Sequence, residues 1–136
     1  MTFAAPVTVW RGIELVSFAG CTADEIPQNV KDFCARMMHQ YNAVWGMEHP
    51  SVAACEISNR GKKFKLVRRE YWMDTENGNH KLMQTGSVIG GIDKEGGEIY
   101  KSQGANAYAK GIRGNVNTPD NGLSALDGRG FIRYLK

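Results

Sequence analysis

One segment of this 136-residue chain repeats its apolar residues at a helical spacing, and this segment constrains the fold most strongly. Within residues 27–45 the apolar positions follow one another at steps of three and one, so a single helical face carries them. They are Val30, Phe33, Cys34, Met37, Met38, Tyr41, Val44 and Trp45. Pro27 suits the start of a helix, because it lacks the N–H that is unpaired there, and Gly46 suits the end. The segment predicts an amphipathic helix packed on one face of a sheet.

The segments around this helix favour strands, because they are rich in β-branched and aromatic residues. Residues 7–18 predict one or two strands of an N-terminal arm, interrupted at Arg11 and Gly12. Further strands are predicted at 52–58, 62–72, 82–92 and 98–101, joined by turns at 59–61 and 93–97 and by a long polar loop at 74–80. Gly90 and Gly91 indicate a bulge, or close packing of the helix, in the third of these strands. The order predicts an α+β fold, with an antiparallel sheet of about four to five strands and one amphipathic helix on one face.

Glycine makes up 16 of the 136 residues, about 12% against a typical 7%. Residues 102–128 are rich in Gly and Asn and show no periodicity, which predicts a long ordered C-terminal loop segment. The apolar residues 131–135 predict a final strand or a docked tail. We therefore expect one domain, 1–136, with an N-terminal arm (1–26), a helix-on-sheet core (27–101) and a Gly/Asn-rich C-terminal extension (102–136).

The net charge of +3 is unevenly distributed: residues 1–59 sum to −3 and residues 60–136 to +6. Positive charge is densest between Arg60 and Arg69, in the predicted strand at 62–72. Single-strand-binding proteins combine such charge with aromatic side chains on a sheet, here Phe64, Tyr71 and Trp72. A solvated face, or an edge strand protected by lysines, has the same pattern. The candidate binding residues of this strand are Lys62, Lys63, Lys65, Arg68 and Arg69.

Signatures of catalysis or metal binding are missing from the sequence. Cys21, Cys34 and Cys55 have neither disulfide nor zinc spacing and are expected to be free thiols. The three histidines lack a catalytic motif around them, and the acidic residues are scattered. We therefore expect a non-enzymatic protein without a metal or cofactor. The N-terminus does not read as a signal peptide, and with no apolar stretch of about 18 residues we expect no membrane span.

The sequence from Gly91 onward resembles a family of small, uncharacterised proteins from tailed-bacteriophage genomes. That family has an aromatic–Val–Asp hairpin ending in Asp–Val–Tyr–Lys, and residues 91–101 here end in Glu-Ile-Tyr-Lys. Its Ala–Lys, Arg–Gly–Asn, Asn–Gly–Leu and terminal Tyr–Leu elements correspond to 109–110, 113–115, 121–123 and 134–135. The chain departs from the family at Ala105, Asn106 and Tyr108, where Trp, Lys and Pro are typical. If those residues form a binding platform, this chain lacks half of it.

The resemblance implies a phage origin and a small α+β domain, but no activity. We expect a virion accessory protein (minor capsid, decoration or head–tail component) that contacts other virion proteins or a second copy of itself. The alternative is a small nucleic-acid-binding or host-takeover protein in the infected cell, so the protein is expected in the virion or the host bacterial cytoplasm. The resemblance adds candidate binding residues, namely Tyr100, Lys101, Lys110, Arg113 and Asn115. Alternatively, the two tyrosines (Tyr100 and Tyr108) pack against the sheet, while Lys101, Lys110 and Arg113 bond loop carbonyls and fix the extension.

Overall fold

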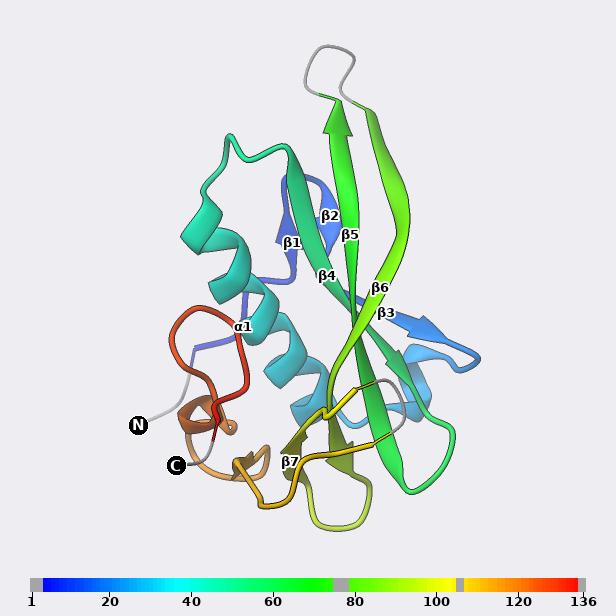
Figure 1. The fold of residues 1–136 in the computed structure, drawn as a ribbon, viewed down its shortest axis with the longest axis vertical. Helices are drawn as coiled ribbons and strands as arrows, with labels where there is room; N and C mark the ends of the chain where they lie inside the picture. The colour runs from blue at the N-terminus through cyan, green and yellow to red at the C-terminus, as the bar shows by residue number, and fades with distance from the viewer. Residues whose placement is uncertain (1–3, 75–78, 105–106, 135–136) are drawn as a thin grey trace.

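The structure, a computed structural model, describes residues 4–74, 79–104 and 107–134. In this part of the chain it is an α+β fold with one α-helix, a two-stranded sheet (β1-β2) and a six-stranded sheet in the order β3-β4-β5-β6-β7-β8 (Figure 1). The strands are β1 Val9–Trp10, β2 Ile13–Glu14, β3 Val16–Ala19, β4 Ser51–Ser58, β5 Lys63–Asp74, β6 Asn79–Asp93, β7 Glu98–Lys101 and β8 Gly114–Asn115. The helix is α1 Gln28–Trp45, and two 3₁₀ turns are η1 Ala23–Glu25 and η2 Leu123–Ala125.

Helix α1 confirms the main sequence prediction. The helix begins at Gln28, one residue later than predicted, because Pro27 is the N-cap, and the Pro27 carbonyl accepts hydrogen bonds from the N–H groups of Val30 and Lys31. Gly46 ends the helix at a φ of 86°, a conformation that favours glycine. The apolar face is buried over its first three turns and packs against β3 and β4. At the last turn the prediction fails, because Val44 and Trp45 are more than half exposed (53% and 55%).

The sheet is larger than the four to five strands predicted and it is mixed, although its pairs from β4 to β8 are antiparallel as predicted. The sheet has six strands, and β3 pairs with β4 in parallel, with Val16 opposite Cys55. Parallel neighbours need a long crossover, and α1 supplies it between β3 and β4. A strand of four residues separated from its partner by a helix gives no local pairing signal, which is why the sequence pattern missed this arrangement.

The N-terminal arm forms the predicted pair of short strands. Arg11 and Gly12 both have positive φ (51° and 83°), as a tight hairpin turn between β1 and β2 requires. Ile13 packs with Val52 and Ala54 of β4 in a small cluster of its own. These β4 residues alternate with Ala53 and Cys55, which belong to the main core, so the hairpin covers the sheet face opposite α1.

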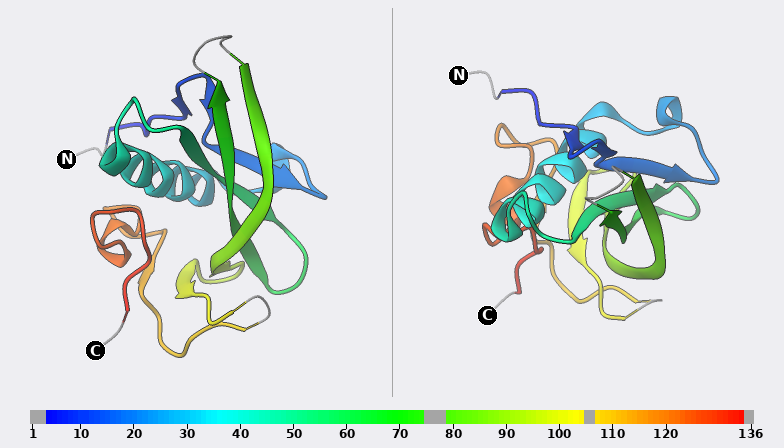
Figure 2. Two further views of the ribbon diagram at one scale, coloured as in Figure 1. Left: turned by 45° about the horizontal axis from the view of Figure 1, so that its top comes forward. Right: turned by 90° about the horizontal axis from the view of Figure 1, so that it is seen from above.

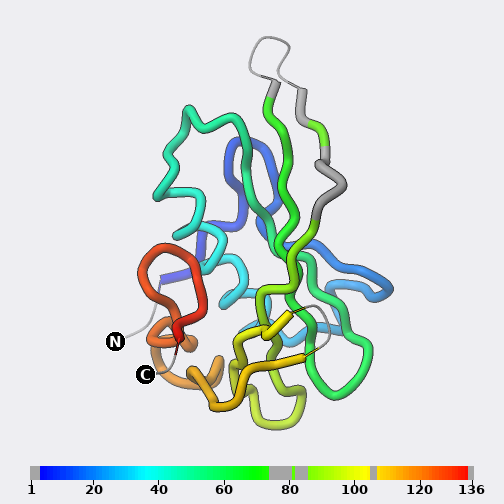
Figure 3. The backbone as a smooth tube through the Cα atoms, viewed as in Figure 1, coloured from blue at the N-terminus to red at the C-terminus, as the bar shows by residue number. Residues whose placement is uncertain are grey.

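Strands β5 and β6 form the long hairpin that extends from the body in Figures 1 and 3. The predicted loop at 74–80 is shorter than expected, because β5 runs to Asp74 and β6 starts at Asn79, and 75–78 lie outside the described residues. The expected bulge is present, since Leu66 faces Gly90 while Val67 faces Val88.

Gly90 and Gly91 contact the C-terminal segment rather than α1, so the alternative of close helix packing is wrong. A Cβ on Gly90 would lie 2.5 Å from Ile132 Cδ1 and from the backbone oxygen of Tyr100. A Cβ on Gly91 would lie 2.5 Å from the Tyr108 ring. Both glycines therefore leave room for side chains from residues after β7, namely Ile132 and Tyr108.

Residues 107–134 form the ordered, largely irregular segment that the composition predicts, and Figure 2 shows it beside α1. The Asn121 side chain joins it to the helix: its amide donates to the Asn29 carbonyl (2.9 Å), and its oxygen accepts from Arg36 Nε (3.3 Å). Ile132 is buried and forms an isolated bridge with Leu126, so the apolar end is a docked tail. The segment is ordered by contacts within its own chain.

Asn42 offers a test of the packing between α1 and β4. It is buried, and its side chain exchanges two 2.8 Å hydrogen bonds with the N–H and carbonyl of Ala53. Asn42→Ala leaves both buried backbone groups unpaired, and we expect a loss of about 1–3 kcal/mol in the free energy of unfolding. Urea denaturation measures it, with Val44→Ala on the exposed side of the same helix as the control. Equal stability of the two variants would contradict this role for Asn42.

Candidate functional site

The basic strand does not form one continuous positive face. Side chains alternate along β5, and Phe64 and Leu66 lie in the core on the α1 side, as predicted. The same alternation places Arg68 on the α1 side, where its guanidinium carbon lies 4.9 Å from the centre of the Tyr41 ring of α1. Lys63, Lys65 and Arg69 occupy the opposite, outer face, and the exposed Lys62 precedes the strand. The fold thus divides the five candidate residues between two faces and a turn.

On the outer face the candidate residues make contacts within the protein. Lys63 Nζ lies 4.8 Å from the ring centre of Tyr100 and 5.3 Å from that of Tyr108. Burial raises the pKa of Tyr108, whose ring rests on Gly91. The alternative that these tyrosines pack against the sheet is therefore confirmed. Arg69 forms a 3.1 Å ion pair with Glu56, so its charge is compensated locally.

Arg113 and Asn115 hold the C-terminal segment together. The Arg113 guanidinium donates to the carbonyls of Lys110 (2.7 Å), Gly111 (2.6 Å) and Arg133 (3.0 Å). The Asn115 amide donates to the Gly96 carbonyl at 2.8 Å. The expected bonding of loop carbonyls is confirmed for Arg113, and also for Lys101, which donates to Ile132 O at 2.7 Å. The side chain of Lys110 is exposed, and only the backbone carbonyl of Lys110 takes part in these hydrogen bonds, as an acceptor from Arg113.

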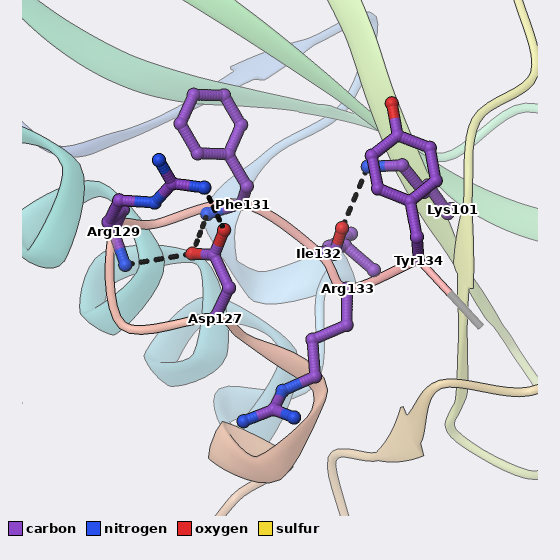
Figure 4. Close-up of a pocket in the computed structure, with 7 residues that line it drawn as sticks. All are labelled: Lys101, Asp127, Arg129, Phe131, Ile132, Arg133 and Tyr134. Atoms are coloured by element: carbon purple, nitrogen blue, oxygen red, sulfur yellow. Dashed lines mark hydrogen bonds and ion pairs between the residues drawn. The ribbon is translucent and has the colours of Figure 1, made fainter. Parts of the chain in front are cut away.

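A groove lies where the C-terminal segment meets α1 and strands β5, β6 and β7. It consists of an open pocket of about 610 Å³ (Figure 4) and a second of about 200 Å³, which share Lys101, Phe131, Ile132 and Tyr134. We call the two together the C-terminal groove. Its lining comes from β5, β6, β7, α1 and the C-terminal segment, namely Met37, Arg68, Ser87, Val88, Ile89, Lys101, Ser102, Asp127, Gly130, Arg129, Phe131, Ile132, Arg133 and Tyr134.

The loop at 127–131 gives the groove its shape. The Asp127 carboxylate accepts hydrogen bonds from the N–H groups of Arg129 (2.8 Å) and Phe131 (3.3 Å) and from the Arg129 guanidinium (3.2 Å), as Figure 4 shows. Gly130 has a φ of 82°, and a Cβ there would lie 2.6 Å from Met37 O and Tyr41 Cβ of α1. Glycine thus allows the loop to touch the helix, and Phe131 then meets Tyr41 edge-on at 5.6 Å.

Positive charge exceeds negative charge in the C-terminal groove. Among the described residues, four cationic side chains line it (Arg68, Lys101, Arg129 and Arg133) against the one carboxylate of Asp127, which pairs with Arg129 at 3.2 Å and leaves the other three cations without an acidic partner in the groove. Lys101 Nζ also lies 4.1 Å from the ring centre of Tyr134, a residue that is 82% exposed. Burial, and then the neighbouring positive charge of Arg113, lower the pKa of Lys101. An anion in the groove would relieve this repulsion between like charges.

Of the ten candidate residues, the structure brings Arg68 and Lys101 together in this groove. The sequence analysis missed the cations Arg129 and Arg133 and the rings of Phe131 and Tyr134 in the groove, and also the ring of Tyr41, which contacts Arg68 and Phe131. Gly128 and Gly130 on either side of Arg129 were an available signal, because paired glycines with positive φ present the residue between them on a tight loop. Tyr41 gave no signal, since it lies on the apolar face of the helix.

The described residues hold no group of three or more His, Cys, Asp or Glu side chains that could bind a metal ion. In the same part of the chain, no helix has the length and apolar character needed to cross a membrane.

Comparison with known proteins places residues 18–135 in a family of unknown function, DUF7717, and the chain belongs to that family. The match runs from β3 to the C-terminal segment, so it includes every residue of the C-terminal groove and leaves out the β1–β2 hairpin. No curated protein and no solved structure matches the chain.

Because the ionised Asp127 carboxylate holds the loop at 127–131, we expect the shape of the groove to depend on pH in acid. Burial raises the pKa of Asp127, but its hydrogen bonds to Arg129 and Phe131 outweigh burial and lower that pKa below 3.8. A lowered folded-state pKa means that the stabilisation is fully present above pH 3.8 and is lost as the pH falls through the folded value. We therefore expect the loop to be unchanged between about pH 7 and 5 and to loosen only in stronger acid.

An NMR titration of the Asp127 carboxyl carbon and the Phe131 amide measures this midpoint. Asp127→Asn should remove the transition from the Phe131 amide. A carboxyl midpoint at or above 3.8 would contradict the expected strength of these hydrogen bonds.

Proposed function

We propose that this protein binds single-stranded nucleic acid in the C-terminal groove. One observation carries the proposal: four cationic side chains and the rings of Phe131 and Tyr134 line the same groove, and its carboxylate, Asp127, compensates only Arg129. A nucleic acid strand combines negative phosphates with flat bases, and proteins bind such strands with positive grooves and exposed aromatic rings. This was the alternative function in the sequence analysis, and the proposal retains Arg68 and Lys101 of its candidate residues.

The arrangement of the rings supports a single strand rather than a duplex. Phe131 is 39% exposed and Tyr134 82% exposed, and each ring has a cation beside it: Arg129 at 5.9 Å from Phe131 and Lys101 at 4.1 Å from Tyr134. A base can stack on such a ring only when it is not paired inside a helix.

Arg68 and its neighbour Arg69 provide a matched test. Replacing either arginine by alanine removes one positive charge from β5. Arg68 lines the groove, however, whereas Arg69 pairs with Glu56 on the opposite face. We expect Arg68→Ala to weaken binding of a fluorescently labelled dodecathymidylate. We also expect the slope of log affinity against log salt to become shallower by about 0.7, the value for one phosphate contact to a single strand. Arg69→Ala should leave the slope unchanged.

Fluorescence anisotropy at several salt concentrations measures both quantities, and a dodecauridylate run in parallel compares RNA with DNA. If the two substitutions weaken binding equally, the binding site lies outside the groove and the proposed location is wrong. Absence of binding by the wild-type chain at low salt, where phosphate contacts are strongest, would refute the proposal.

A virion accessory protein that acts by protein–protein contacts is the second candidate, favoured by exposed apolar side chains. Val7 and Val9 of the N-terminal arm and Val44 and Met47 at the end of α1 are each 44–59% exposed. Such residues suit contacts with other virion proteins or with a second copy of the chain. Mass spectrometry of purified particles tests this candidate: we expect a fixed copy number per particle, and absence from the particles excludes it.

A further inference from the structure

A row of rings leads out of the C-terminal groove along the last turns of α1. Tyr41 meets Phe131 at 5.6 Å, Trp45 follows Tyr41 at 6.5 Å, and His49 follows Trp45 at 5.0 Å, all measured between ring centres. Residues four apart lie on the same side of a helix, so Tyr41 and Trp45 stand one above the other. We call Phe131, Tyr41, Trp45 and His49 the aromatic track.

The outer end of the track is fixed in place although it is open to solvent. Trp45 is 55% exposed, whereas the earlier apolar residues of α1 are mostly buried. His49 is held after the helix by Ser51, whose N–H donates to its Nδ1 at 3.2 Å, and by the Arg11 guanidinium, which donates to its carbonyl. The Trp45 ring therefore presents a large apolar surface that no described contact within the protein fully covers.

The charges around the track change along its length. At its inner end, Arg68 lies 4.9 Å from Tyr41 and 5.7 Å from Phe131. At its outer end Glu48 lies in the turn after α1 and the Arg11 guanidinium lies on the His49 carbonyl, so one negative and one positive charge stand there. The outer end thus offers aromatic surface without an excess of positive charge, and its contribution to binding must come from stacking rather than from phosphate contacts.

We infer that a bound strand leaves the C-terminal groove along the aromatic track and stacks a base on Trp45. This inference rests on the proposed function and adds to it the path of the strand. The occupant is a single-stranded nucleic acid, because the track continues a positively charged groove and begins at an arginine placed over two of its rings. Trp45 is not among the groove residues and lies beyond Phe131 and Tyr41, so only a strand that extends past these two rings reaches it.

Two probes of different length test the inference on the full chain. For a labelled dodecathymidylate, we expect Trp45→Ala to weaken binding at least fivefold, as the loss of one base–aromatic stack requires, without changing the salt slope. For a tetrathymidylate we expect less than a twofold effect. Val44→Ala, at the adjacent position and equally exposed, is the matched control and should leave both affinities unchanged. Circular dichroism and thermal unfolding verify that both variants are folded.

The outcomes separate this inference from the proposed function. If Trp45→Ala does not weaken dodecathymidylate binding, or weakens both probes equally, the strand does not follow the track, while the groove proposal stands. If the wild-type chain binds neither probe, the proposed function and the track fail together. If poly-glutamate binds instead and Arg68→Ala weakens it, the groove takes an acidic protein segment, which also overturns the inference.

Discussion

The contact between Ile132 and the bare backbone of Gly90 is the interaction on which the candidate site depends. Ile132 occupies the space that a side chain at position 90 of β6 would fill. A Cβ on Gly90 would lie 2.5 Å from Ile132 Cδ1 and 2.5 Å from the backbone oxygen of Tyr100. With Ile132 seated, its carbonyl accepts the hydrogen bond from Lys101, and the loop that carries Arg129 and Phe131 is placed against α1. Without this contact the cations of β5 and β7 would face solvent instead of lining a groove.

The sequence predicted those parts of the fold that depend on local pattern. Helix α1, the hairpins of the meander, the turn at Arg11 and Gly12 and the bulge beside Gly90 all follow from periodicity or from backbone preferences of neighbouring residues. The parallel pairing of β3 with β4 could not be read in this way, because it joins segments on either side of a helix. The same holds for the C-terminal segment. Its position is set by the contact of Ile132 with Gly90 and by the contact of Gly130 with α1, and not by its own periodicity.

The candidate site shows a similar limit. A run of six positive charges between Arg60 and Arg69 looks continuous in the sequence, yet alternation along β5 places Arg68 and Arg69 on opposite faces of the sheet. On the outer face, Arg69 pairs with Glu56 and Lys63 lies beside the ring of Tyr100. On the α1 side, Arg68 meets cations and rings contributed from residues 101–134. The number of charges was readable from the sequence, but their grouping required the tertiary structure.

The groove is built largely by a segment that joins the fold through contacts distant in sequence, such as Gly90 with Ile132 and Asn29 with Asn121. Contacts of this kind form late and open before the local hairpins and helix do. The groove therefore exists only in molecules whose C-terminal segment is docked, and any ligand must favour that docked population. Its apparent dissociation constant is the intrinsic one divided by the docked fraction, so the strength of a purely internal contact sets how tightly the protein can hold a partner.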